Sequence, residues 1–149
     1  MARVPLVQDD DEAARATGVF DTFKDEGRPP SDIFRALAGS AYEWSHHRPM
    51  ALAAGVTADQ AAALAAWRSS SAFGPTERLV LTATEAVHDM AVTGELFGEL
   101  EAALGQPGAI ELIVVVSQYE AVARIIQALG VEVEADHEQH LADWVEIVR

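Results

Sequence analysis

Apolar residues recur along this chain mostly at the 3.6-residue period of an α-helix, and strand-like alternation is scarce. Between residues 75 and 91, one face of the expected helix carries Leu79, Ala83, Ala86, Val87 and Met90. Capping residues, glycines and prolines delimit further helices at 9–27, 40–54, 57–67, 93–105 and 107–130. They also predict a short turn at 31–37 and a short helix around Leu141, Trp144 and Val145. The pattern predicts an all-α bundle of about six helices.

The helix expected at 107–130 is apolar around most of its circumference, which a helix tolerates only when neighbours surround it. An alternative interpretation takes Leu112–Val116 as a buried parallel strand. The apolar run continues into Tyr119 without a turn signal, however, so the helix is favoured.

Composition supports helices and excludes several classes of protein. The 149 residues include 28 alanines and carry a net charge of −14, with Lys24 as the only lysine, so we expect no nucleic-acid binding. Polar residues lie close to the longest aliphatic run, and no basic start with an apolar block precedes the acidic Asp9–Glu12, so we expect one cytoplasmic domain without a membrane span. The absence of cysteine excludes thiol chemistry.

One helical stripe carries candidate chemistry. Glu43 and His47 are one turn apart on the helix expected at 40–54, so carboxylate and imidazole face the same way, while His46 points about 100° away. Pro49 cannot donate to the carbonyl of Ser45, so we expect a kink or restart there and a free acceptor beside the imidazoles. From spacing alone, an ordinary surface pair remains the alternative.

These residues resemble the signature helix of the carboxymuconolactone decarboxylase family, whose helical fold is shared with alkylhydroperoxidase D. The resemblance rests on Gly39–Val56 and continues in order through Phe73–Arg78, Glu111–Arg124 and Ala128–Val131, after a leader at Arg3–Val7. It implies a single domain over 1–149, with a leader and shortened front half at 1–38 and an acidic tail at 130–149.

Two departures qualify the resemblance. Peroxidase members place a Cys-x-x-Cys pair where this chain has Ser40 and Glu43, so the resemblance favours the decarboxylase branch, which has a glutamate four residues before the histidine. Members also carry about 30 further helical residues before the signature helix. That piece normally supplies a glutamate that faces the signature histidine. In this chain Asp32, Glu26 or a residue of another subunit would have to take its place.

The resemblance implies acid–base chemistry of the decarboxylase or lactone type on a small carboxylic acid or lactone, with no cofactor. In this interpretation His47 delivers or takes the proton, and Glu43 orients His47 and adjusts its pKa. His46 or Arg48 holds a substrate carboxylate. Ser40 and Tyr119 are further substrate-binding candidates, although a tyrosine on the central helix is more often part of the core. The family also implies a homo-oligomer, commonly a trimer or hexamer, so a non-catalytic module for oligomerisation or ligand binding is the alternative function.

Other polar groups have simpler interpretations. Three Glu-x-x-His pairs could describe a di-iron site, but His88 should face water, and we expect no metal. Glu120 and Arg124 are spaced as a supporting ion pair. His137 and His140 lie among acidic residues, which predicts a solvated tail.

Overall fold

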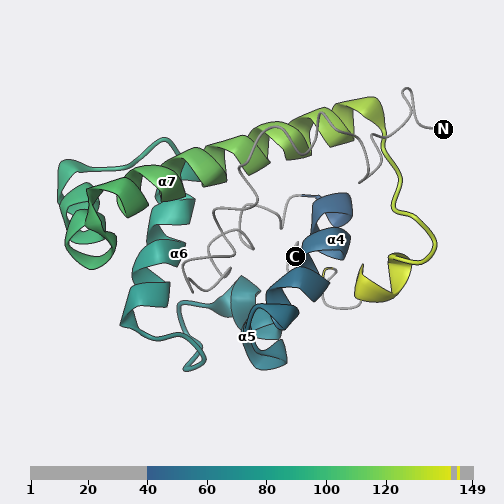
Figure 1. The fold of residues 1–149 in the computed structure, drawn as a ribbon, viewed down its shortest axis with the longest axis horizontal. Helices are drawn as coiled ribbons and strands as arrows, with labels where there is room; N and C mark the ends of the chain where they lie inside the picture. The colour runs from purple at the N-terminus through teal and green to yellow at the C-terminus, as the bar shows by residue number, and fades with distance from the viewer. Residues whose placement is uncertain (1–39, 142–143, 145–149) are drawn as a thin grey trace.

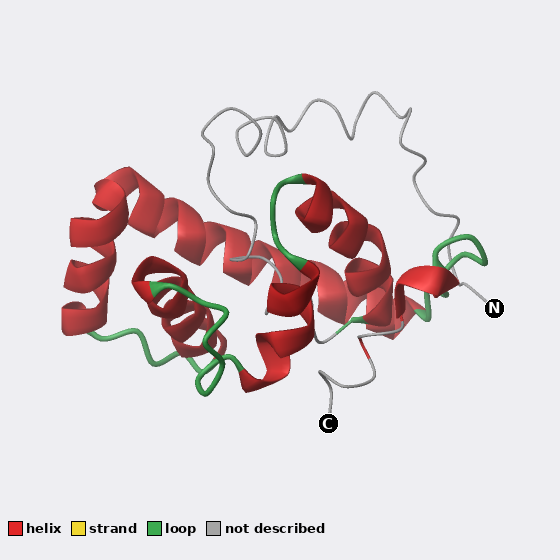
Figure 2. Ribbon diagram, turned by 90° about the horizontal axis from the view of Figure 1, so that it is seen from below, coloured by secondary structure: helices red, strands yellow, loops and turns green. Residues whose placement is uncertain are grey.

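The computed structural model describes residues 40–141 and residue 144, and every regular element in that part of the chain is helical (Figure 2). In chain order the elements are α4 (Ala41–Ala53), α5 (Ala58–Ala63), η1 (Leu64–Ala66), α6 (Pro75–His88), α7 (Gly94–Leu129) and η2 (Glu138–Leu141), where η denotes a 3₁₀ helix. The all-α prediction is therefore confirmed here. The leader, the helix at 9–27 and the turn at 31–37 lie outside the described residues, so the count of about six helices stays a prediction.

Helices α4, α5 and α6 begin at the residues that the sequence predicted, next to local capping residues or a proline. The Ser40 hydroxyl accepts a hydrogen bond from the backbone N–H of Glu43 at 3.4 Å and begins α4. Thr57 and Gln60 exchange both hydrogen bonds of a capping box at the start of α5. Pro75 opens α6, where the missing N–H would have no intrahelical partner. The starts of these helices are thus encoded by residues within one turn of each boundary.

Helix α7 consists of the two predicted helices, joined at a kink. Gly105 has φ 73° and ψ 161°, a left-handed conformation that interrupts the helix just before Pro107. The second arm ends at Gly130, which caps it with φ 63°. Leu112–Val116 lies inside this arm, so the strand alternative is wrong. Within the described residues, no helix combines the length and the apolar character needed to cross a membrane.

Helix α7 runs across the molecule and packs against α6, and it comes near α4 at the contact between Tyr119 and His47 (Figure 1). The first apolar core lies between α6 and α7 and consists of Val80, Ala83, Leu100, Ala109, Leu112, Val115, Val116 and Tyr119. The second gathers residues of α4, of the segment around α5 and η1, and of α6: Trp44, Ala51, Val56, Leu64, Trp67, Phe73 and Leu81. Tyr119 therefore belongs to the first core yet lies where α7 passes α4.

The chain after α7 folds back, and η2 packs beside α4 (Figure 1). Leu141 and Trp144 pack against the second core. The 3₁₀ helix η2 ends at Leu141 and so includes only the first of the three residues of the predicted short helix; Val145 lies outside the described residues, and the rest of that helix stays a prediction. The expectation of a solvated tail is wrong for this segment, because its apolar residues are held against the helical body.

Candidate functional site

Glu43 and His47 lie on the face of α4 that is turned toward α7. Their side chains are 5% and 19% exposed, so neither group is in bulk water. Oε2 of Glu43 lies 3.3 Å from Nδ1 of His47, which confirms the contact predicted from the spacing of four residues. Ala51 on the same stripe is also buried. The interpretation as an exposed surface pair is therefore wrong.

The hydrogen bonds of His47 fix its neutral tautomer. Nδ1 lies 2.9 Å from the main-chain oxygen of Glu43, and a carbonyl oxygen can only accept, so Nδ1 carries the hydrogen. Nε2 of the neutral ring is then an acceptor. The hydroxyl of Tyr119 lies 3.1 Å from Nε2 and donates to it. The imidazole is thus held from both sides, by α4 at Nδ1 and by α7 at Nε2.

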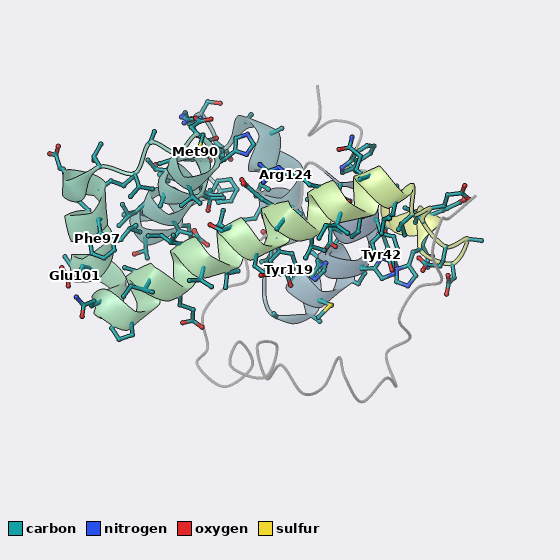
Figure 3. All side chains as sticks on the ribbon, turned by 90° about the horizontal axis from the view of Figure 1, so that it is seen from above. Tyr42, Met90, Phe97, Glu101, Tyr119 and Arg124 are labelled. Atoms are coloured by element: carbon teal, nitrogen blue, oxygen red, sulfur yellow. The ribbon has the colours of Figure 1, made fainter. Side chains whose placement is uncertain are left out.

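Tyr119 reaches His47 from a position 72 residues later in the sequence. Figure 3 shows it on the side of α7 next to α4. The two rings meet edge to face with centroids 5.1 Å apart, a favourable aromatic geometry. The sequence placed Tyr119 among the candidates, but its contact with His47 depends on how the two helices pack. The structure therefore joins three candidates into one group, the Glu43–His47–Tyr119 triad.

Burial sets the protonation of this triad. Loss of water raises the pKa of Glu43 from 4.5 to about 7 and lowers the pKa of His47, although the bond to the Glu43 carbonyl acts in the opposite direction. Burial and the nearby Glu43 carboxyl raise the pKa of Tyr119 to about 12. Burial thus perturbs the pKa of both the carboxyl and the imidazole beside a neutral phenol, and such perturbed pKa values are typical of acid–base sites.

Ser40 and Arg48 lie at different places on the same helix. The Ser40 hydroxyl is used as the cap of α4, so its observed role is structural. Arg48 follows His47 and is half-buried. Helix α4 continues through Pro49 as one element, so the restart is wrong, while the kink stays a prediction. The positions assigned to Asp32 and Glu26 lie outside the described residues.

His46 points away from the triad, as its helical position predicted. Its ring stacks on Tyr42 at 4.3 Å and on His137 at 3.9 Å between centroids. Its Nδ1 lies 3.0 Å from the Tyr42 carbonyl oxygen, and its Nε2 lies 3.4 Å from Oε2 of Glu134. His46 is thus engaged with the C-terminal segment, while its catalytic role stays a prediction.

The carbonyl of Ser45 is the acceptor that Pro49 was expected to free. Nδ1 of His137 lies 3.4 Å from this oxygen and donates to it. Sequence reasoning placed His137 in a solvated tail and missed this contact. The proline was a usable signal, because it predicted an unpaired carbonyl beside the imidazoles, but the donor's identity required the fold.

The remaining polar candidates form surface contacts between helices. Glu120 lies 2.8 Å from Nδ1 of His88 and 3.4 Å from Nη2 of Arg124, which confirms the predicted ion pair. His88 is 66% exposed, as expected. Glu85 pairs with Arg68. Across the described part of the chain, no three His, Asp or Glu side chains gather closely enough to hold a metal ion.

Comparison with known proteins identifies the signature region. The model of the carboxymuconolactone decarboxylase family matches residues 35–86, about a third of the chain, and this match includes Glu43 and His47. Over this stretch the chain is similar to that family, which agrees with the motifs quoted from the sequence. No curated protein and no solved structure matches the chain. Tyr119 and His137 lie beyond the matched residues, so their assignment depends on the geometry described above.

Proposed function

We propose that this protein carries out acid–base chemistry of the decarboxylase or lactone type on a small carboxylic acid. The observation that carries the proposal is the buried contact between Glu43 and His47, where burial raises the pKa of the carboxyl to about 7 and lowers that of the imidazole. A catalytic acid or base works best when its pKa is close to the working pH. The match of residues 35–86 to the decarboxylase family model supports the same class of reaction.

In this proposal His47 moves the proton and Glu43 orients the ring. The Glu43 main-chain oxygen holds Nδ1–H, and the Glu43 carboxylate stabilises the imidazolium when it forms. Decarboxylation leaves an electron pair on carbon, and that carbon then requires a proton. A proton on Nε2 of the His47 imidazolium meets this requirement.

Arg48 is the proposed contact for the substrate carboxylate. The net charge of −14 repels anions, so capture of a carboxylic acid requires a local cation. Arg48 lies next to His47 on α4 and is the cationic side chain nearest to it in sequence. A bidentate guanidinium suits the two oxygens of a carboxylate.

The direct test compares turnover of γ-carboxymuconolactone and related lactone acids by the parent, Glu43→Gln and His47→Asn. We expect each substitution to lower kcat by about 10²–10⁴, the usual range for a general acid–base group. His88→Asn is the matched control, because His88 is exposed on α6, and it should retain the parent rate. Equal rates for all four proteins would contradict the proposal.

A second candidate function, self-association, is favoured by one surface. Ile110, Val114 and Ile125 fall within about 60° on one side of α7 and are 50%, 59% and 57% exposed. Large apolar side chains grouped on a surface mark interaction sites. We propose that a second copy of the chain covers this face.

Sedimentation velocity of the parent and of a Val114→Glu, Ile125→Glu double variant tests this second function. We expect an oligomer for the parent and a smaller species for the variant, because buried charge disfavours association. Thr82→Glu, which adds charge at an exposed position of α6, is the control. A monomeric parent would overturn the self-association proposal without affecting the catalytic one.

A further inference from the structure

Both nitrogens of the His47 ring are occupied in this fold. Nδ1 faces the main-chain oxygen and the carboxyl of Glu43, and Nε2 faces the hydroxyl of Tyr119. A proton that leaves or reaches His47 at Nε2 must therefore displace Tyr119 or pass through its oxygen. A group that approaches Nε2 of His47 therefore meets the Tyr119 hydroxyl.

We propose that Tyr119 is a catalytic residue that exchanges a proton directly with the substrate, while His47 supplies or accepts that proton at Nε2. This inference rests on the proposed acid–base function. It goes further because it assigns the contact with the reacting carbon to Tyr119 on α7. His47 then passes its proton to Tyr119 and not to the substrate.

The position of Tyr119 suits a relay. Its ring is fixed by burial, with 9% exposure, and by the edge-to-face contact with His47. A phenol oxygen has one hydrogen to donate and two lone pairs that accept. It can therefore release its proton to a substrate while it receives another from Nε2. Helix α7 supplies the rigid support, because Tyr119 lies among the core residues Leu112, Val115 and Val116.

Tyrosine alone is a poor acid at neutral pH, which is why the relay needs His47. The hydroxyl is neutral near pH 7, since its pKa is about 12. If Tyr119 lost its proton without replacement, an unstable phenolate would remain beside Glu43. A simultaneous proton transfer from His47 avoids that charge.

The proposed step conserves protons and electrons. When CO₂ leaves, the electron pair of the broken C–C bond remains on the substrate as an enolate. That pair takes the Tyr119 hydroxyl proton and forms a C–H bond, while Nε2 of the His47 imidazolium gives its proton to the Tyr119 oxygen. His47 ends neutral with Nδ1–H still bound to the Glu43 carbonyl, which is the tautomer in the structure, and regains a proton from solvent.

The first test is Tyr119→Phe, which keeps the ring and removes only the hydroxyl. We expect kcat on the lactone acids to fall by about 10² or more, with KM changed by less than about three-fold, because the lost group acts in the proton transfer. Thermal unfolding monitored by circular dichroism establishes whether the variant is folded. Tyr42→Phe on α4 is the matched control and should keep a kcat close to that of the parent.

A second test counts the protons that move in the step. The relay moves two, one from Tyr119 to carbon and one from Nε2 to the Tyr119 oxygen, so a plot of kcat against the fraction of deuterium oxide should be curved for the parent. Direct transfer from His47 moves one proton and predicts a straight line.

The outcomes separate this inference from the proposed function. An active parent with an inactive His47→Asn variant and a fully active Tyr119→Phe variant would overturn the relay alone. A loss of rate in Tyr119→Phe with a linear dependence of the parent's kcat on deuterium oxide would also overturn it. A parent without turnover on any lactone acid would overturn the proposed function and the relay with it.

Discussion

At the scale of single residues, two opposing effects act on Glu43. The first turn of a helix favours a carboxylate by about 0.3–1 kcal/mol through the helix dipole. Burial disfavours the charge more strongly, since the pKa rises from 4.5 to about 7, which corresponds to roughly 3 kcal/mol at 1.36 kcal/mol per pH unit. Burial therefore decides the protonation of Glu43. The free-energy cost of ionising this carboxyl falls on the candidate site.

The raised pKa of Glu43 predicts a specific dependence of stability on pH. Between pH 4.5 and 7 the folded state keeps a proton on Glu43 that the unfolded chain has lost, so this contribution is full below 4.5 and disappears as pH rises through 7. His47 acts in the opposite sense, because its lowered pKa costs stability as pH falls below 6.5. Comparison with Glu43→Gln isolates the carboxyl.

We expect the free energy of unfolding of the parent, relative to Glu43→Gln, to fall by roughly 3 kcal/mol between pH 4.5 and 7.5. Urea unfolding of both proteins across this range measures the difference. A constant difference would show that Glu43 ionises in the fold at the same pH as in the unfolded chain, and would remove the basis for its catalytic tuning.

At the scale of elements, the kink of α7 depends on Gly105. Its φ of 73° with ψ of 161° is a region essentially restricted to glycine, so Gly105→Ala should destabilise the protein by about 1–3 kcal/mol. Gly98 is the matched control on the same helix, because a Cβ there meets nothing within 4 Å. We expect Gly98→Ala to stabilise by about 0.5–1 kcal/mol. Urea unfolding that gave both variants the same sign would contradict this account.

The C-terminal segment is held to α4 by a hydrogen bond that the helix itself cannot make. We expect His137→Phe, which keeps a stacking ring but loses the N–H to the Ser45 carbonyl, to cost about 1 kcal/mol. Amide hydrogen exchange should accelerate at residues 137 and 140, whose N–H groups bond within this segment. The control is His88→Phe, at an exposed site on α6. Unchanged exchange in His137→Phe would show that stacking and apolar contacts alone hold the segment.

These elements also show what the sequence could predict. The Thr57–Gln60 capping box, the Pro75 start and the break between Gly105 and Pro107 are local signals, and each is confirmed. The Glu43–His47 contact was equally local, because one helical turn brings the two together. The contacts of Tyr119 with His47 and of His137 with Ser45 join residues far apart in the chain. Helical periodicity holds no information on such pairings, which depend on how α7 and η2 pack against α4.

At the scale of the whole molecule, the net charge of −14 opposes the local cation proposed for substrate capture. The two effects differ in range. Repulsion by the summed acidic charge acts over distances that salt screens, with a Debye length of about 30 Å at 0.01 M and about 8 Å at 0.15 M. A guanidinium in contact with a carboxylate is screened much less. A change of ionic strength therefore distinguishes the long-range repulsion by the net charge from the short-range contact with Arg48.

We expect kcat/KM for an anionic lactone acid to rise several-fold as sodium chloride increases from about 0.01 to 0.15 M, because screening removes the long-range repulsion. The neutral methyl ester of the same acid is the control and should show no such dependence. Arg48→Gln should lower kcat/KM for the acid more than for the ester, yet keep the rise with salt, because the field of the remaining acidic residues is unchanged. A fall of kcat/KM with salt would instead mean that a local basic surface outweighs the net charge and attracts the substrate over long distances.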